Sequence, residues 1–576
     1  MSRDRLQWSG TCKESRLKIP LLTSLLKGRG RWRVRRVLRG YRLLRKSGRL
    51  GLIADLNNEL ANLPLHIAPA KFSATLFGAG IADAETICRQ LLLTRVAGGE
   101  LNASLLLSLG SGLPLAAHLP PEWRESISRR GFVLPGISAA LLWRAFLAVM
   151  LLAGMFRIGK LITGGVAAFF TAPARLLRRY VYFDSLSKGN LPSPCRDGRS
   201  HDIISWYRQW EGRTRDIDTI AHGVVGAADC EVQGTSVTYL PAPLPPLGDP
   251  ARLTKFAFWS GRATLRAAVD LFRGRWWHAL LLPQAALAAQ ARLLDPSLLA
   301  KEYLFHNSGY TYRPLWTYEA ERCGSKITFY FYSTNCEPFK IGEGYRDPFA
   351  WNVMTWPHYL VWDECQADFV RRAVGERGTI EVVGPIWFAA TAEEMPEIGR
   401  EGVAVFDVTP FRTSKFATLC IDPEYYVPGT CIGFLRDVRD CLDEAGYRML
   451  WKRKRKIGSM AHPLYRFYAD EIAKRDNVTI VDSDVSAYRV IEASAAVISM
   501  SFTSTAHIAR ELGKPTCYYD PHGMIQRDDR AAHGITIVTG REELGAWLKE
   551  VTASRGRWEG DLWLDSSHPA SRSAGV

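Results

Sequence analysis

From about residue 300 onward, short apolar strands alternate with helices, and this alternation constrains the fold more than any other feature of the chain. Lys326–Ser333 (KITFYFYS) is rich in aromatic and β-branched residues, which favours a buried strand. A second series of strands and helices begins after Glu393 with Val403–Val408. Such alternation indicates parallel sheets covered by helices and joined by right-handed crossovers. The sequence therefore predicts an α/β protein with two Rossmann-like lobes and a central cleft, joined by a linker near 386–400.

The expected elements can be placed residue by residue. The first series has strands at Tyr303–Phe305, Lys326–Ser333, Tyr359–Trp362 and Thr379–Val383. The second series has strands at Val403–Val408, Arg448–Trp451, Val478–Val481, Ala495–Met500 and Thr516–Tyr519, and helices at Cys431–Glu444, Pro463–Arg475, Ser486–Ser494 and Thr505–Leu512. Ligands of parallel sheets bind beyond the carboxyl ends of the strands, so we expect the functional residues in the loops that follow them.

The net charge is unevenly distributed along the chain. Residues 1–50 hold 16 Lys and Arg against Asp4 and Glu14, which accounts for +14 of the formal +16. Apolar residues are interleaved with the basic ones between Lys27 and Arg49, as in helices that lie on anionic membranes. The same pattern would suit a nucleic acid, or a solvated tail. We expect a basic amphipathic arm over 1–50.

The most apolar stretch of the chain is Leu141–Phe170. Its longest uncharged run, Ala145–Phe156, has 12 residues, and a transmembrane helix needs about 20. A helix on the membrane surface or in a protein core fits better. We expect a helical, membrane-associated region over 51–180, a first Rossmann-like lobe over 181–390, a second Rossmann-like lobe over 400–550 and a tail over 551–576.

Several classes of protein are disfavoured by what the sequence lacks. The 11 Cys form no C-x-x-C pair and no cluster with His at zinc spacing, which favours reduced thiols in the cytoplasm. No secretory signal is visible near the N-terminus. No G-x-G-x-x-G follows a strand, which counts against a redox dinucleotide fold. We expect no cofactor and no bound metal.

The strongest local motif is the hydroxyl-rich turn between an apolar strand and a helix at 499–506 (SMSFTSTA). A helix start offers free backbone N–H groups and a partial positive charge. A single hydroxyl would suffice to cap the helix, but here four lie within five positions. We predict that this turn binds a phosphate through Ser501, Thr503, Ser504 and Thr505.

Two further groups lie near the same predicted edge. His462 precedes Pro463 at the start of a helix, where its ring can donate a hydrogen bond to an anion. The run Lys452–Lys456, from which we single out Lys452 and Arg453, can bind phosphates. Asp482 and Asp484 form a D-x-D triplet that we expect to contact the nucleotide or to cap the next helix.

A transfer reaction at the predicted phosphate site would also need a carboxylate that acts as a base or as a nucleophile in the first lobe. The candidates are Asp184, Asp202 and Glu211. Asp202 and Glu211 flank an aromatic segment, and we rank Asp202 first. That segment contains Trp206, Tyr207 and Trp210, rings on which a sugar can stack.

These motifs resemble known families. SFTSTAHIARELGKPTCYYDP, together with HNSGYTYRPLWTYE, FYFYSTNCEPFK and YLVWDECQADFVRR, resembles the PFTS-motif polysaccharide biosynthesis family over roughly 180–545. The chain departs from the family name at Ser501, where Pro would precede Phe502. His462-Pro463 and the Ser/Thr turn are also similar to the nucleotide-binding motifs of bacterial sialyltransferases and Kdo transferases, which have the GT-B fold.

The resemblance implies a function, with 181–390 as the acceptor lobe and 400–550 as the nucleotide-sugar-binding lobe. A metal-independent glycosyltransferase of the GT-B type would use a nucleotide sugar, preferably a CMP-activated acidic sugar such as Kdo or sialic acid. His462 would face the donor phosphate, and the acceptor would be a glycan or lipid-linked glycan of a capsule, O-antigen or lipopolysaccharide. We expect the protein on the inner face of the cytoplasmic membrane, with no specific nucleic acid. The alternative is a non-catalytic nucleotide- or polyanion-binding protein that uses the basic arm.

Overall fold

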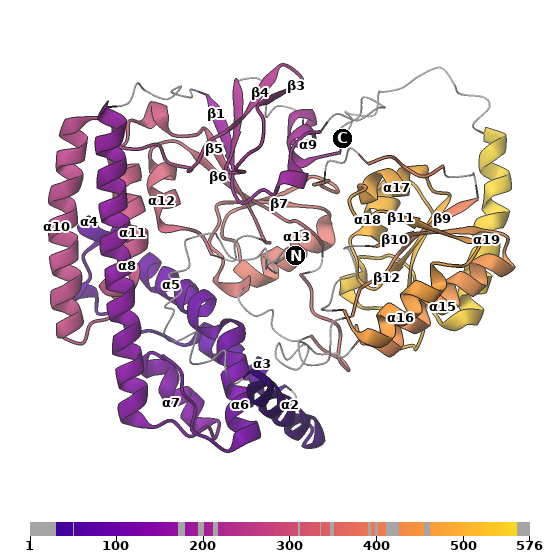
Figure 1. Cartoon of the computed structure of the whole chain (residues 1–576), viewed down its shortest axis with the longest axis horizontal. Helices are drawn as coiled ribbons and strands as arrows, with labels where there is room; N and C mark the ends of the chain where they lie inside the picture. Colours follow the sequence, from indigo (N-terminus) through magenta and orange to yellow (C-terminus); the bar gives the residue numbers. More distant parts are fainter. Residues whose placement is uncertain are drawn as a thin grey trace. The chain divides into compact units, whose positions relative to one another are not determined.

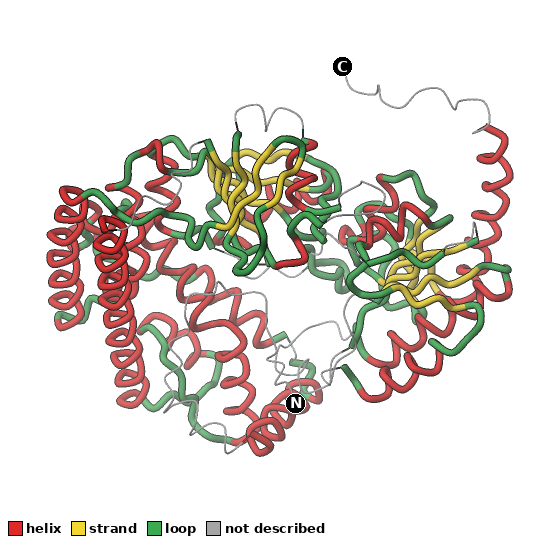
Figure 2. Tube along the Cα trace, turned by 45° about the horizontal axis from the view of Figure 1, so that its top comes forward, coloured by secondary structure: helices red, strands yellow, loops and turns green. Residues whose placement is uncertain are grey.

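The computed structural model describes most of the chain as two compact units. Unit 1 holds the described residues up to 338 and 351–389, and unit 2 holds 339–345, 393–397, 401–410 and the described residues from 425 onward. Each unit is built around its own sheet (Figure 2). The described residues are 30–49, 51–170, 179–193, 201–210, 217–308, 312–334, 336–345, 351–389, 393–397, 401–410, 425–453 and 461–561.

Unit 1 begins with the helical region that the sequence predicted. Its elements are α2 (Gly30–Lys46), α3 (Leu52–Asn62), the 3₁₀ turn η1 (Pro69–Lys71), α4 (Ala74–Phe77), α5 (Ile81–Leu92), the π-helical η2 (Leu93–Leu101), α6 (Asn102–Ser111), α7 (Pro121–Arg129) and α8 (Gly136–Phe170).

The described part of the basic arm is a helix packed on the protein. α2 contacts α6 along its length and buries Val37, Tyr41 and Leu44. Glycines let the two backbones meet, because a Cβ on Gly110 would lie only 1.9 Å from the carbonyl oxygen of Arg36. These three residues, which we expected on a membrane, therefore pack inside unit 1, and the exposed face of α2 is mostly basic, with Leu43 as an apolar member.

Three long helices of unit 1 pack together: α8, α10 (Pro250–Phe272) and α11 (Trp277–Leu293) (Figure 1). α11 is buried along nearly its whole length and contacts both of the others. By length and composition alone α8 is apolar enough to cross a membrane. It is far longer than the uncharged run seen in the sequence, since it continues through Arg144, Arg157 and Lys160.

The sheet of unit 1 has eight strands in the order β3-β4-β2-β1-β5-β6-β7-β8. All neighbours are parallel except β3 and β4. The strands are β1 (Tyr180–Phe183), β2 (Thr219–His222), β3 (Cys230–Val232), β4 (Thr235–Tyr239), β5 (Glu302–His306), β6 (Lys326–Tyr330), β7 (His358–Val361) and β8 (Thr379–Val382). The other helices are α9 (Ile203–Gln209), α12 (Leu315–Arg322) and α13 (Glu364–Val374), with 3₁₀ turns η3 (Lys188–Asn190), η4 (Pro296–Leu298) and η5 (Trp351–Val353).

The sheet of unit 2 is entirely parallel, in the order β11-β10-β9-β12-β13-β14. The strands are β9 (Gly402–Phe406), β10 (Arg448–Lys452), β11 (Val478–Val481), β12 (Ala496–Met500), β13 (Thr516–Asp520) and β14 (Ile537–Thr539). The helices are α15 (Pro428–Glu444), α16 (Pro463–Ile472), α17 (Ala487–Ala493), α18 (Thr505–Glu511) and α19 (Gly540–Asp561), with the 3₁₀ turn η6 (Arg530–Ala532).

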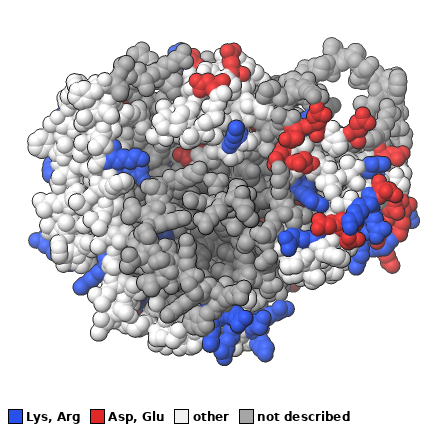
Figure 3. Space-filling model, in the orientation of Figure 1, with Lys and Arg blue, Asp and Glu red and all other residues white. Residues whose placement is uncertain are grey.

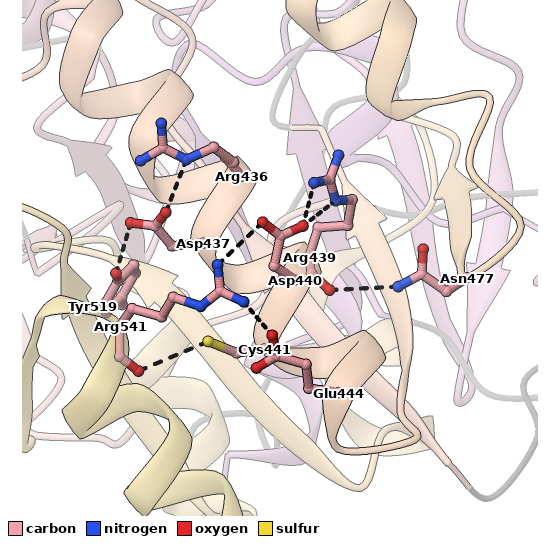
Figure 4. A network of polar contacts seen from close by, with 9 residues as sticks. All are labelled: Arg436, Asp437, Arg439, Asp440, Cys441, Glu444, Asn477, Tyr519 and Arg541. Carbon is pink, nitrogen blue, oxygen red and sulfur yellow. Dashed lines mark hydrogen bonds and ion pairs between the residues drawn. The ribbon is translucent and has the colours of Figure 1, made fainter.

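A polar network fastens α15 to its neighbours in unit 2 (Figure 4). The hydroxyl of Tyr519 on β13 donates to Asp437 over 2.9 Å. Arg541 on α19 pairs with Asp440, 3.5 Å away, and with Glu444. Because Asp437 is buried, its bond to Tyr519 matters more for stability than the exposed ion pairs of Arg541.

Both sheets are doubly wound, with helices between successive parallel strands, which confirms the predicted α/β fold with two Rossmann-like lobes. The unit boundaries differ in detail from the expected ones. The helices before 180 belong to the same compact unit as the first sheet, and 339–345 belongs to unit 2. α19 continues to Asp561, so the expected tail over 551–576 begins as helix.

Candidate active site

The strand order of unit 2 points to one place on its sheet. The chain runs from β9 outward to β10 and β11, then crosses over to β12 and runs outward to β13 and β14. The direction therefore reverses between β9 and β12, and doubly wound sheets bind ligands beyond the carboxyl ends of strands at such a switch point. The loops that meet there are 407–410, after β9, and 501–504, after β12. The predicted hydroxyl-rich turn lies at this point.

Within the turn, two of the four predicted phosphate ligands belong to an internal chain of hydroxyl groups. The hydroxyl of Thr503 donates to the carbonyl of Met500 over 2.9 Å, so its 3.1 Å contact with Thr505 must be donated by Thr505. The 2.8 Å contact between Thr505 and Ser499 is then donated by Ser499. Thr503 and Thr505 thus brace the turn instead of offering donors to a ligand, contrary to our expectation.

The two serines of the turn differ in burial. Ser501 is fully buried, where its side chain accepts a 3.5 Å hydrogen bond from Tyr425 and its carbonyl accepts one from Tyr426. Ser504 is the half-buried N-cap of α18, and its hydroxyl makes no capping bond. Ser504 and Thr505 are the half-buried residues of the turn, and Ser504 stands at the start of the helix.

His462 caps α16 and is held beside the same switch point. Its backbone N–H donates to Pro410, in the loop after β9, over 2.9 Å. Its ring Nδ1 accepts the N–H of Leu464 over 3.3 Å. Because Nδ1 is the acceptor, the proton of the neutral ring sits on Nε2, which can donate to an anion.

A buried carboxylate that sequence reasoning missed fixes this arrangement. Asp407, directly after β9, accepts hydrogen bonds from Trp451 over 3.0 Å and from Tyr465 in the first turn of α16. Burial raises the pKa of Asp407 above its ordinary value, although both hydrogen bonds oppose the shift. The signal was a lone acid at the end of the Val403–Val408 strand. Asp407 holds the start of α16, and with it His462, at the sheet edge.

Lys452, the last residue of β10, is hydrogen-bonded to the acidic loop that follows β11. The ammonium of Lys452 is buried and donates to the carbonyl of Ser483 over 3.0 Å. Burial lowers the pKa of Lys452 to about 8, although Asp482 and Asp484 raise it. Asp482 accepts the backbone N–H of Asp484 over 2.8 Å, so its side chain folds onto its own loop.

Arg453, the next residue of the basic run, makes a cation–π contact with an aromatic ring. The guanidinium of Arg453 lies 4.4 Å from the ring centre of Trp451. Residues 454–456, the rest of the predicted basic run, lie outside the described residues. Lys452 and Arg453 make the edge positive near the switch point.

In unit 1, Asp202 has a different role from the one we expected. It is fully buried and caps α9, accepting the N–H groups of Ile204 and Ser205, each over 2.9 Å. A carboxylate enclosed in this way is a poor catalytic base. Glu211, the other expected carboxylate, lies outside the described residues.

The aromatic segment beside Asp202 is also structural. Trp206 and Tyr207 are buried, and the hydroxyl of Tyr207 donates to Glu302 over 2.6 Å. The expected stacking of a sugar on these two rings does not fit their burial.

The switch point of unit 1, between β1 and β5, holds a group that the sequence did not reveal. His306, the last residue of β5, contacts the carbonyl of Ser185 through Nε2 over 3.4 Å. Since a carbonyl only accepts, Nε2 donates and Nδ1 keeps a lone pair. That Nδ1 and the hydroxyl of Tyr330 are both buried and have no hydrogen-bond partner in the structure as described. Burial lowers the pKa of His306 to about 4, so the ring is neutral at physiological pH.

Aromatic rings surround this histidine. His306 stacks on Tyr330 with ring centres 5.4 Å apart, and Phe388 packs 4.2 Å from Tyr332, which is 38% exposed. A buried acceptor and a buried donor, lined by rings, complement a group that both donates and accepts, such as a sugar hydroxyl. The only sequence signal was the polar turn that starts at His306.

Comparisons with known proteins identify a family for this chain. The family model described as "Polysaccharide biosynthesis PFTS motif protein" matches residues 258–548. A search of curated proteins gives no match. Solved structures with similarity to the chain include UGT2 of Phytolacca americana complexed with UDP-2fluoro-glucose and pterostilbene (12% identity, 66% of this chain and 95% of that chain, TM-score 0.30). They also include a UDP-GlcNAc 2-epimerase from Methanocaldococcus jannaschii (8% identity, 65% and 92%, TM-score 0.33). Such low scores add nothing to the fold, which rests on the sheet topology.

Proposed function

Since this chain belongs to the PFTS-motif polysaccharide biosynthesis family, we propose that it is a glycosyltransferase that moves a sugar from a nucleotide donor to a glycan or lipid-linked acceptor. The observation that carries the proposal is the edge of the unit 2 sheet at its switch point. There His462 presents Nε2–H, Ser504 begins a helix, and Lys452 and Arg453 supply positive charge. An anionic phosphate of a donor fits this edge.

The proposed chemistry breaks the bond between the anomeric carbon of the sugar and a donor phosphate oxygen. The departing phosphate gains negative charge, which the Nε2–H of His462 and the positive start of α18 stabilise. The acceptor hydroxyl forms the new bond and loses its proton. A base must take that proton. Unit 1, described by itself, offers one candidate, because Nδ1 of the neutral His306 ring can accept a hydrogen bond from a sugar hydroxyl.

Finer features of the proposal rest on the resemblance to sialyltransferases and Kdo transferases. We propose CMP as the preferred nucleotide, an acidic sugar such as Kdo or sialic acid, and transfer without a metal ion or another cofactor. The product would be a bacterial capsule, O-antigen or lipopolysaccharide, made on the inner face of the cytoplasmic membrane.

The first test is thermal unfolding of the full chain with CMP, UDP, GDP or ADP, each with Mg²⁺ and with EDTA. A ligand at about 100 times its Kd adds about 2.7 kcal/mol to the stability of the native state, a readily measured increase in Tm. We expect CMP to raise the Tm equally with and without Mg²⁺. A response to UDP or GDP alone would discard the CMP preference and keep the glycosyltransferase.

Variants then locate the site. We expect His462→Ala and Ser504→Ala each to weaken nucleotide binding about tenfold or more, the loss of one hydrogen bond to a charged group. Leu464→Ala removes an exposed side chain from the same helix start and serves as the control. Unchanged binding in a folded His462→Ala, Ser504→Ala double variant would refute the site. Salt-sensitive binding of polyanions without any nucleotide response would favour the non-catalytic alternative.

A further inference from the structure

One face of α8 carries a stripe of apolar side chains toward solvent. Ile137, Leu141, Leu152, Phe156 and Phe170 are between 60% and 82% exposed. Their spacings are close to whole numbers of helical turns, so they share one side of the helix. A soluble protein rarely exposes so long an apolar strip unless something covers it.

α10 carries a second stripe. Phe258, Leu265 and Phe272 follow each other at intervals of seven residues and are 74%, 66% and 93% exposed. α8 and α10 contact each other, and both pack on the buried α11. Their exposed sides therefore face away from α11, so that two apolar stripes lie on neighbouring helices of unit 1.

The exposed charges within the two helices themselves are of one sign. α8 contains no Asp or Glu, and the one acid of α10, Asp270, is buried and paired with Arg266, Arg275 and His278. In Figure 3 the surface over α10 and α8 is largely white, with Lys and Arg around it and no described acid. The exposed cations of the two helices are Arg144, Lys160, Lys255 and Arg262, and the exposed Arg273 follows α10 as its C-cap.

We propose that α8 and α10 together form the surface by which this protein lies on an anionic lipid bilayer. The apolar stripes enter the outer acyl region, and the cations meet the lipid phosphates. A second copy of the chain is a poorer occupant of this face, because a symmetric pair would bring like charges together. The inference deepens the membrane location within the proposed function and rests on it.

The opposite side of α8 shows why the helix lies in the membrane plane instead of crossing it. A Cβ on Gly154 would lie 2.6 Å from the Leu282 side chain, and one on Gly165 would lie 2.8 Å from the carbonyl of Leu247. α8 is thus packed on protein at both positions. A spanning α8 would carry its partner helix, with Lys255 and Arg262, into the hydrocarbon.

The test is flotation of the full chain, without nucleotide, on vesicles of pure phosphatidylcholine and on vesicles with added phosphatidylglycerol. We expect binding to the phosphatidylglycerol vesicles that weakens with salt. The triple change Phe258→Ser, Leu265→Ser and Phe272→Ser should weaken binding about a hundredfold, because three side chains no longer reach the acyl region. Leu152→Ser with Phe156→Ser provides an independent variant on α8 with an expected loss of about tenfold or more.

Controls separate this proposal from its rivals. Leu464→Ser with Phe467→Ser changes similarly exposed residues, 63% and 69%, in unit 2 and should leave vesicle binding unchanged. Lys255→Gln with Arg262→Gln should reduce binding only to the anionic vesicles, by about 30-fold. Folded stripe variants that bind like the parent chain would overturn the proposal, as would a parent chain that stays unbound to anionic vesicles or self-associates through the stripes. Each of these failures leaves the nucleotide-dependent Tm shift, and so the donor site, intact.

Discussion

At the scale of single residues, burial decides which polar side chains can act on a ligand. Asp202 and His306 are both buried, yet they differ in their hydrogen bonds. The Asp202 carboxylate accepts two backbone N–H groups of α9, whereas Nδ1 of His306 has no partner among the described residues. The carboxylate of Asp202 is therefore occupied in capping α9, whereas Nδ1 of His306 can accept a hydrogen bond from a ligand.

This difference gives a test of the acceptor side. Asp202→Asn keeps a side-chain oxygen for capping, so we expect sugar transfer within about threefold of the parent chain. His306→Asn should lower transfer about 100-fold or more, typical of losing a group that handles a proton. Nucleotide release from CMP-sugars, with and without acceptor, measures both. Loss of transfer in folded Asp202→Asn would restore that residue as the base.

At the scale of elements, close helix packing explains why the described part of the basic arm, residues 30–49, packs on unit 1. α2 approaches α6 where two glycines face opposing backbone, since a Cβ on Gly40 would lie 2.0 Å from the carbonyl oxygen of Leu106. An amphipathic helix can bury its apolar face on a membrane or on a protein surface, and the sequence of α2 is compatible with both. Gly40 on α2 and Gly110 on α6 let α2 bury its apolar face on the protein.

Gly110→Ala tests this packing. The added methyl group would overlap the carbonyl of Arg36, so we expect a loss of about 2–4 kcal/mol or the detachment of α2. Gly159→Ala, on α8 where nothing lies within 4 Å of the new methyl, should be neutral or slightly stabilising. Urea unfolding gives the stability, and proteolysis within 30–49 reports detachment. Equal behaviour of the two variants would contradict the close packing of α2 on α6.

At the scale of the whole molecule, buried histidines make stability depend on pH. Burial lowers the pKa of both His278 and His306 from the ordinary 6.5 to about 4. Between pH 6.5 and about 4 these two histidines are protonated in the unfolded chain and neutral in the folded chain, so the unfolded chain binds more protons. The stability that the neutral rings provide is therefore complete above pH 6.5 and is lost as the pH falls toward 4.

His306→Asn should flatten this dependence. Relative to the parent chain, the loss of unfolding free energy between pH 7 and pH 4 should be smaller by about 2–3 kcal/mol, since one titrating group is removed. Urea unfolding at intervals of half a pH unit measures the slope, and His522→Asn, which changes a histidine in unit 2, is the control. An identical slope in His306→Asn and in the parent would mean that His306 is protonated alike in both states.

The sequence by itself determined the alternation of strands and helices, the parallel sheets and the family. Periodicity, capping residues and turn residues are local properties, so KITFYFYS and the SMSFTSTA turn could be recognised wherever they lie in space. The positions of β12, α18 and His462 at a strand end or helix start followed from the same local rules.

Only the tertiary structure decided which polar groups have partners. The turn at 499–505 is held by hydroxyl contacts from Ser499 to Thr505 and from Thr505 to Thr503, which depend on the backbone conformation of the folded turn. The bond from Tyr465 to Asp407 joins segments that are distant in sequence, and the lack of a partner for Nδ1 of His306 depends on what packs around it. The same holds for the face of α8 and α10, because burial of one side against α11 is what leaves the other side exposed. A hydrogen bond or a buried face belongs to a pair of segments, and the chain must fold before either member has its partner.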